Sequence, residues 1–198
     1  MLSLLGTIVL SLPLQAQDAT PPSHRQGFWL GFGIGGGVNL SSSLDDGSKA
    51  GFASLFRAGG TLTPKWLLGG ETAGWSAEVG DDAWAWRSNL SAIAIFYPSA
   101  GRGLFLKAGP GVAFISESRS TTIRVDGVDV TTSQSASEVG FGATLGVGHD
   151  IRIGRKLSLV PEVTYLLQAF EARSTSTELG DIPGTNSILL FTLGLTFH

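Results

Sequence analysis

A histidine, a serine and a glutamate lie close together in the second half of the sequence, and these are the residue types of a hydrolase triad. His149 ends one alternating apolar segment, and Ser158 and Glu162 lie in the next. In such a triad the histidine must reach the serine hydroxyl and take its proton. Side chains of a strand alternate between two faces, which places His149 on the apolar face and Ser158 and Glu162 on the polar face. The pattern therefore argues against this triad, and we expect no catalytic residues.

Ligands for a metal ion are few. The chain contains no cysteine, which excludes disulfides, thiol catalysis and Cys-ligated metals. The histidines lie in separate parts of the chain, at His24, His149 and His198. The acidic pairs Asp45-Asp46 and Asp81-Asp82 could hold a divalent cation together with phosphate groups, although acidic loop residues are usually just solvated. We expect no metal and no cofactor.

Charged residues also occur on the polar face of segments whose other face is apolar. These residues are Arg57, Glu71, Arg87, Lys107, Glu138 and Glu162. The positive and negative charges among them balance. Arg57 and Glu71 are equally distant from Pro64, so a hairpin that turns at Pro64 places them opposite each other. The pattern predicts a lumen charge network whose members pair with one another and plug a narrow interior.

The elements that must position these residues are strands. Alternation of apolar and small or polar residues, punctuated by turn residues, predicts strands over residues 28–39, 50–62, 66–78, 83–97, 103–115, 138–149, 156–168 and 187–198. Repeated alternation of about ten residues is typical of a barrel that faces lipid outside and a polar interior inside. The predicted fold is therefore all-β, an eight-stranded antiparallel up-and-down transmembrane β-barrel.

Composition and loop lengths support this fold. Only 15% of the residues are charged, and 28 are glycine, so the outward strand faces lack the charges that a water-facing barrel needs. The connections alternate between long and short, as in outer-membrane barrels. Asp126-Gly127 is a hairpin signal, so the fifth and sixth strands should project beyond the membrane. A net charge of -3 without a basic cluster argues against nucleic-acid binding.

Aromatic residues cluster near the predicted strand ends, where membrane barrels carry interfacial girdles. The predicted aromatic girdle consists of Phe28, Trp66, Trp84, Trp86, Phe96, Tyr97, Tyr165 and Phe197.

The N-terminus has the pattern of an export signal. An apolar run from Met1 to Leu14 precedes a small-residue cleavage site at Ala16, and it is too short to cross a bilayer as a helix. It departs from the usual pattern because it lacks a basic start. The predicted organisation is a signal peptide over residues 1–16, a periplasmic linker over 17–27 and a barrel over 28–198.

Three stretches, Leu104 to Phe114, Gly140 to His149 and Leu157 to Tyr165, are similar to the later strands of small eight-stranded outer-membrane barrels. The chain resembles the outer-membrane protein A and X and opacity-protein group over nearly its whole mature length. This resemblance implies an integral protein of the outer membrane of a Gram-negative-type bacterium. The implied role is non-enzymatic, either structural or in surface interaction through extracellular loops; the alternative is a lipid A-modifying enzyme.

The resemblance also implies partners. They are outer-membrane lipid and lipopolysaccharide, and the barrel assembly machinery, which recognises a terminal aromatic residue in this group. Phe197 matches that residue, although His198 follows it. We expect a monomer that does not bind nucleic acid.

Overall fold

The computed structural model describes residues 25–41, 49–79, 83–99, 101–125, 128–171 and 184–198. Its strands are β1 (Phe28–Asn39), β2 (Lys49–Thr63), β3 (Trp66–Glu78), β4 (Ala83–Phe96), β5 (Leu104–Val125), β6 (Val128–His149), β7 (Ile151–Arg152), β8 (Leu157–Ala169) and β9 (Thr185–Phe197). Among the residues described there is no α-helix with the length and hydropathy to span a bilayer. The predicted signal peptide, most of the linker, His24 and both acidic pairs lie outside the described residues.

The strands form a closed antiparallel barrel, which confirms the predicted fold class. Each strand from β1 to β5 pairs with the one that follows it in the chain, β9 pairs with both β1 and β8, and β6 pairs with β8 to complete the circle. The short β7 continues β6 and pairs with the start of β8, so it adds no further strand to the wall. Closure leaves no strand edge in the barrel wall, as a bilayer requires.

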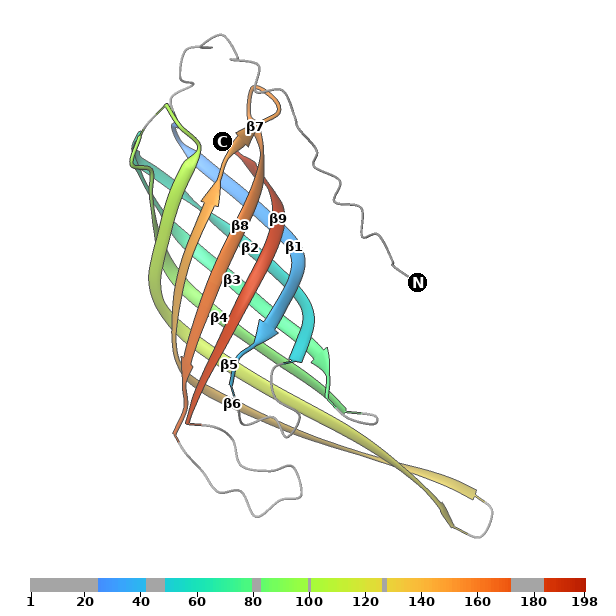
Figure 1. Cartoon of the computed structure of the whole chain (residues 1–198). Helices are drawn as coiled ribbons and strands as arrows, with labels where there is room; N and C mark the ends of the chain where they lie inside the picture. The colour runs from blue at the N-terminus through green and yellow to red at the C-terminus, as the bar shows by residue number, and fades with distance from the viewer. Residues whose placement is uncertain (1–24, 42–48, 80–82, 100, 126–127, 172–183) are drawn as a thin grey trace, which may run out of the picture.

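The predicted strand bounds agree with the structure except around the fifth and sixth strands. There the predicted bounds of 103–115 and 138–149 are too short, because β5 and β6 stay paired up to the Val125 and Val128 rung. The expected projection of these strands is confirmed: they leave the barrel together as a long ribbon (Figure 1). The Asp126-Gly127 turn itself lies outside the described residues.

The two faces of the wall differ as expected. Large apolar side chains cover the outside, including Phe32, Ile34, Phe56, Leu68, Leu90, Leu106, Leu145, Phe191 and Leu193, which are all exposed. Water would be an unfavourable solvent for such a band, whereas lipid chains solvate it. The C-terminus lies at the end that carries β7, opposite the projecting ribbon (Figure 1). Short turns mark the periplasmic end of outer-membrane barrels, which predicts that the ribbon projects outward from the cell.

This arrangement predicts that charge is not tolerated on the outward band. Leu193 is 53% exposed in the middle of β9, and Leu193→Arg should lower the free energy of unfolding in lipid vesicles by about 2 to 4 kcal/mol. Leu106→Arg on β5 should behave in the same way. The matched control is Ser133→Arg on the ribbon, where the change should stay within about 0.5 kcal/mol. Equal tolerance of arginine at Leu193 and Ser133 would contradict the assigned faces.

Candidate functional site

The barrel interior holds a quartet of charged side chains, defined here as Arg57, Glu71, Lys107 and Glu162. Arg57 Nη1 lies 2.7 Å from Glu162 Oε2, and Lys107 Nζ lies 2.6 and 2.5 Å from the two oxygens of Glu71. Lys107 also forms an ion pair with Glu162, and Arg57 Nη1 lies 4.0 Å from Glu71 Oε2. Each cation therefore contacts both anions, and no side chain of the quartet is more than 3% exposed.

The alternation of side chains along the strands and the register between the strands bring the four residues of the quartet together in the lumen. Arg57 and Glu71 occupy the same rung between β2 and β3, as the hairpin turn at Pro64 requires. Glycines on other strands leave room for the two long cations. A Cβ at Gly146 would lie 2.7 Å from Lys107 Cε, and one at Gly31 would lie 3.0 Å from Arg57 Nε. Larger residues at these positions would compete with the cations for the narrow lumen.

Buried charges are costly unless they are paired and hydrogen-bonded. The quartet carries no net charge, and hydroxyl groups add further bonds: Thr164 donates to Glu162 at 2.9 Å, and Arg57 donates to Thr196 at 3.4 Å. Removing one member would leave the opposite charges with one partner fewer in a buried environment. The quartet is therefore a unit whose members depend on one another.

Apolar side chains cover the quartet on the side of the short turns. We call this group the aromatic layer after its three rings, Trp29, Tyr97 and Phe105. Its aliphatic members are Leu67, Ile93, Ile95 and Val160, and all seven side chains are at most 2% exposed. The Arg57 guanidinium carbon lies 5.2 Å from the centre of the Phe105 ring, within the range of a cation–π contact. The layer separates the quartet from the periplasmic mouth.

Amide side chains form a second polar network toward the outer end. Gln168 Nε2 donates to Asn89 Oδ1 at 2.8 Å, and Asn186 Nδ2 donates to Gln168 Oε1 at 2.9 Å. Asn89 also donates to the backbone carbonyls of Ala143 and Leu167. The network therefore links β4, β6, β8 and β9 across the lumen. Sequence reasoning missed it, although the period of two places its members on the inner face.

The structure does not bring Arg87 and Glu138 into the quartet. Arg87 donates to Glu117 on β5 at 2.7 Å, a partner that was not predicted. Glu138 lies beyond the last rung between β6 and β8, Phe141 to Ala169, where β6 follows the ribbon away from β8. The predicted membership of Glu138 in the lumen charge network is therefore wrong, because its strand has left the closed wall at that height. It lines a cavity at the rim instead.

Asp150 organises the periplasmic mouth, which sequence reasoning also missed. Its Oδ2 accepts a hydrogen bond of 2.7 Å from the Tyr97 hydroxyl and lies 3.5 Å from Arg25 Nη2 and 3.6 Å from His198 Nε2. The Arg25 guanidinium lies over the Tyr97 ring at 3.6 Å. These contacts join the segment before β1 to the residue after β9.

Burial and charge set the protonation states in the mouth. Burial, and then the neighbouring Asp150 carboxylate, raise the pKa of Tyr97, so its hydroxyl remains a donor. Burial alone would raise the pKa of Asp150, but the His198 imidazole, the Tyr97 hydroxyl and the Arg25 charge together hold it below its ordinary value. Asp150 is therefore an anion at neutral pH.

The other predicted residues are placed as follows. Most members of the predicted aromatic girdle point outward, namely Phe28, Trp66, Trp84, Trp86, Phe96, Tyr165 and Phe197. Tyr97 is the exception, because it is 2% exposed and points into the lumen, so its assignment to the girdle is wrong.

His149 is exposed whereas Ser158 and Glu162 are buried, so these three do not form a triad. Within the described part of the chain, no group of three metal-ligating side chains converges.

The contacts of the quartet predict that removal of one of its side chains strongly lowers the free energy of unfolding. Glu71→Ala leaves Lys107 without its bidentate partner, and it should lower the free energy of unfolding by about 3 to 5 kcal/mol in urea titrations of the vesicle-embedded barrel. Glu78→Ala, at an exposed position on the same strand, is the control and should change it by about 0.5 kcal/mol or less. A small effect of Glu71→Ala would mean that water solvates the quartet.

The mouth predicts a pH-dependent effect of Asp150. The folded-state pKa of Asp150 is lowered, so its contribution is present above its ordinary pKa and is lost as pH falls through the folded-state value. At neutral pH, Asp150→Asn should cost about 1.5 to 3 kcal/mol, the range of hydrogen bonds to charged groups. The difference between wild type and variant should shrink as the pH falls below about 4. A difference that is constant with pH would contradict the assigned anion.

Comparisons with known proteins agree with this architecture. The family model of the outer membrane protein β-barrel domain matches residues 2–197. Similar solved structures include Neisserial surface protein A, with 16% identity, 86% of this chain and 96% of that chain covered, and a TM-score of 0.53. Ail, the attachment invasion locus protein of Yersinia pestis, has 12% identity, coverages of 87% and 98%, and a TM-score of 0.53. OprG from Pseudomonas aeruginosa has 13% identity, coverages of 88% and 98%, and a TM-score of 0.50.

No curated protein matches the sequence. At these identities the solved structures show the fold, and the family match shows the membership. The chain is an outer-membrane protein and belongs to the outer membrane protein β-barrel domain family.

Proposed function

We propose that this protein is a non-enzymatic, monomeric outer-membrane barrel with a closed lumen, and that it acts through the ribbon formed by β5 and β6. The observation that carries the closed lumen is the quartet packed against the aromatic layer. Both span an interior that, in an eight-stranded barrel, is only wide enough for side chains. Because the quartet has no net charge, it offers no field that would attract an ion.

The ribbon is the part of the molecule best suited to meet a partner. β4 pairs with β5 only as far as the rung of Ala83 and Arg119, and β8 pairs with β6 only as far as Phe141. Beyond these rungs each ribbon strand keeps one edge without a partner strand among the described residues. Such an edge offers backbone donors and acceptors to another molecule. The exposed residues near its base are mainly polar, including Ser118, Arg119, Ser120, Ser133, Gln134 and Ser135.

The alternative, a lipid A-modifying enzyme, finds no supporting arrangement of side chains among the residues that the structure describes. Its best candidates face opposite sides of the wall, with His149 outside and Ser158 and Glu162 inside.

We also expect lipid and lipopolysaccharide to contact the outward apolar band, and the assembly machinery to recognise the end of β9 through the outward Phe197.

The closed lumen predicts that the purified protein does not conduct. In planar bilayers it should give no steady conductance steps above those of a mock preparation from the same cells. Barrel formation in the sample is verified by its altered electrophoretic migration before boiling. A steady, large conductance that scales with the amount of protein would overturn the proposal.

A variant with a shortened ribbon tests whether the lumen side chains or the ribbon block the passage of ions. Replacing residues 119–134 by a two-residue turn removes most of the ribbon, keeps Glu117 as the partner of Arg87, and leaves the quartet and the aromatic layer intact. This variant should remain silent in the bilayer. Conductance that appears only in the shortened variant would mean that the ribbon, and not the lumen, closes the barrel.

A further inference from the structure

Exposed cations surround the end of the barrel that carries the short turns. They lie on the turn between β2 and β3, on the turn between β4 and β5, and on the hairpin of β7 and β8, all at the end that also holds the C-terminus (Figure 1). We call these residues the basic collar: Lys65, Arg102, Arg152, Arg155 and Lys156. Each of them is exposed, and within the described part of the chain none of them forms an ion pair.

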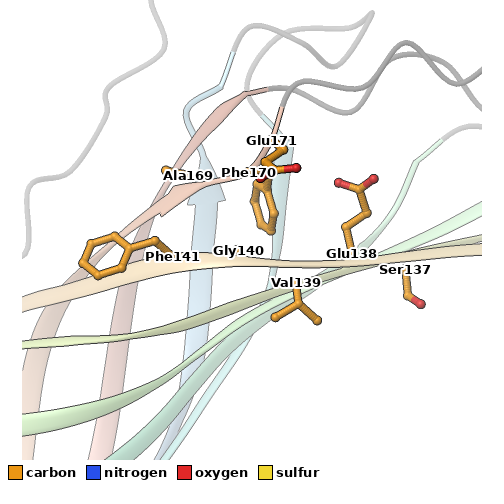
Figure 2. Close-up of a pocket in the computed structure, with 8 residues that line it drawn as sticks. All are labelled: Ser137, Glu138, Val139, Gly140, Phe141, Ala169, Phe170 and Glu171. Carbon is orange, nitrogen blue, oxygen red and sulfur yellow. The ribbon is translucent and has the colours of Figure 1, made fainter.

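Among the residues that the structure describes, no exposed carboxylate lies at this end. Asp150 is close to the collar, but it is buried and already paired. The accessible carboxylates lie at the opposite end, where Figure 2 shows Glu138 and Glu171 beside the outer rim, and where Glu78 and Glu117 are also found. The surface charge around the short turns is therefore positive, and it complements an anionic partner.

Hydrogen bonds fix the backbone that carries the collar. The Lys65 amide donates to the Thr63 hydroxyl at 3.3 Å, and the Lys65 carbonyl accepts from the Tyr97 amide at 2.8 Å. The Lys156 carbonyl accepts from the His198 amide at 3.0 Å. The turns thus hold these cations at the edge of the barrel wall, and only their long side chains need to adapt to a partner.

Exposed apolar side chains lie next to the collar and continue the lipid-facing band. Trp66 follows Lys65 in the chain and is 44% exposed, and Ile151 and Ile153, on either side of Arg152, are 44% and 56% exposed. A soluble polyanion would leave these apolar side chains in water, whereas a bilayer covers them. Interfacial aromatic residues lie at the level of the lipid headgroups, so the neighbouring cations reach the same level. These observations favour a lipid over a soluble acidic partner.

We propose that the basic collar is an interaction surface for anionic phospholipids in the leaflet at this end of the barrel, which is the periplasmic leaflet in the predicted orientation. The apolar stems of the lysine and arginine side chains lie along the band, and their charged ends reach the lipid phosphates. A zwitterionic headgroup offers the same phosphate, but its own cation offsets the attraction, so the collar selects lipids with a net negative charge. The surface is separate from the quartet and the ribbon, and the proposal depends on neither a closed lumen nor a partner of the ribbon.

The test uses the full chain in phosphatidylcholine nanodiscs and compares the association of chain-spin-labelled phosphatidylglycerol with that of spin-labelled phosphatidylcholine. The wild type should prefer the anionic probe by about threefold or more. Salt at about 1 M, where the Debye length is about 3 Å, should remove most of this preference. The barrel signature in electrophoresis verifies that each sample is folded.

Two double variants remove the same charge from opposite ends of the molecule. Arg155→Gln, Lys156→Gln in the collar should reduce the preference by about twofold or more. Arg119→Gln, Arg124→Gln on β5 in the ribbon is the matched control, and it should change the preference little, because carboxylates of the outer end already offset these cations.

Polyglutamate serves as the probe for the soluble alternative. At a negative charge equal to that of the lipid probe it should compete only weakly, because it does not cover the apolar side chains beside the collar. The proposal is overturned by equal association of the two lipid probes, by equal losses in the two double variants, or by a preference that survives replacement of the whole collar by glutamine. Polyglutamate that displaces the anionic lipid at equal charge would also overturn it and would assign the collar to a soluble acidic partner.

Discussion

The narrow interior of an eight-stranded barrel is the constraint on which the rest of this structure depends. Side chains alone can fill it, and any charge they carry is removed from water. Arg57, Glu71, Lys107 and Glu162 meet this constraint by placing each cation in contact with both anions. The strands that carry the quartet lie on different sides of the barrel, so its contacts also fix how those strands face each other across the lumen.

The remaining lumen follows from the same constraint. Where no ion pair is available, apolar side chains fill the space, as in the aromatic layer on the periplasmic side of the quartet. On the outer side of the quartet, polar side chains form hydrogen bonds with one another, as Gln168 does with Asn89 and Asn186. At the periplasmic mouth, Asp150 joins Arg25, Tyr97 and His198. The outside has the opposite requirement, because lipid solvates apolar side chains and leaves unpaired charges costly.

The period of two predicted much of this arrangement. It placed Arg57, Glu71, Lys107 and Glu162 on the inner face, and turn symmetry placed Arg57 opposite Glu71. It could not predict that Lys107, and not Arg57, forms the short contacts to Glu71, because contacts across the lumen depend on the stagger of strands that are not neighbours. Tyr97 was misplaced because its aromatic type was given more weight than its parity, which points inward.

Other errors arose from long-range geometry. The fifth and sixth strands were predicted over residues 103–115 and 138–149, because the serine- and threonine-rich residues between them lack the apolar alternation of a lipid-facing strand, yet backbone pairing continues there. Glu138 has inward parity, but the pairing of β6 with β8 ends at Phe141, so at Glu138 the described wall continues only on the side of β5. The mouth joins residues from opposite ends of the chain, and no local pattern predicts that contact.

The most direct measurement is a double-mutant cycle on Lys107 and Glu71 in lipid vesicles. If the quartet is a desolvated unit, Lys107→Ala should cost much less in the background of Glu71→Ala than in the wild type, because the first substitution has already removed its main partner. We expect a coupling of at least about 1 kcal/mol in the free energy of unfolding. Strictly additive costs would contradict the account, because they would show that the two side chains are solvated independently.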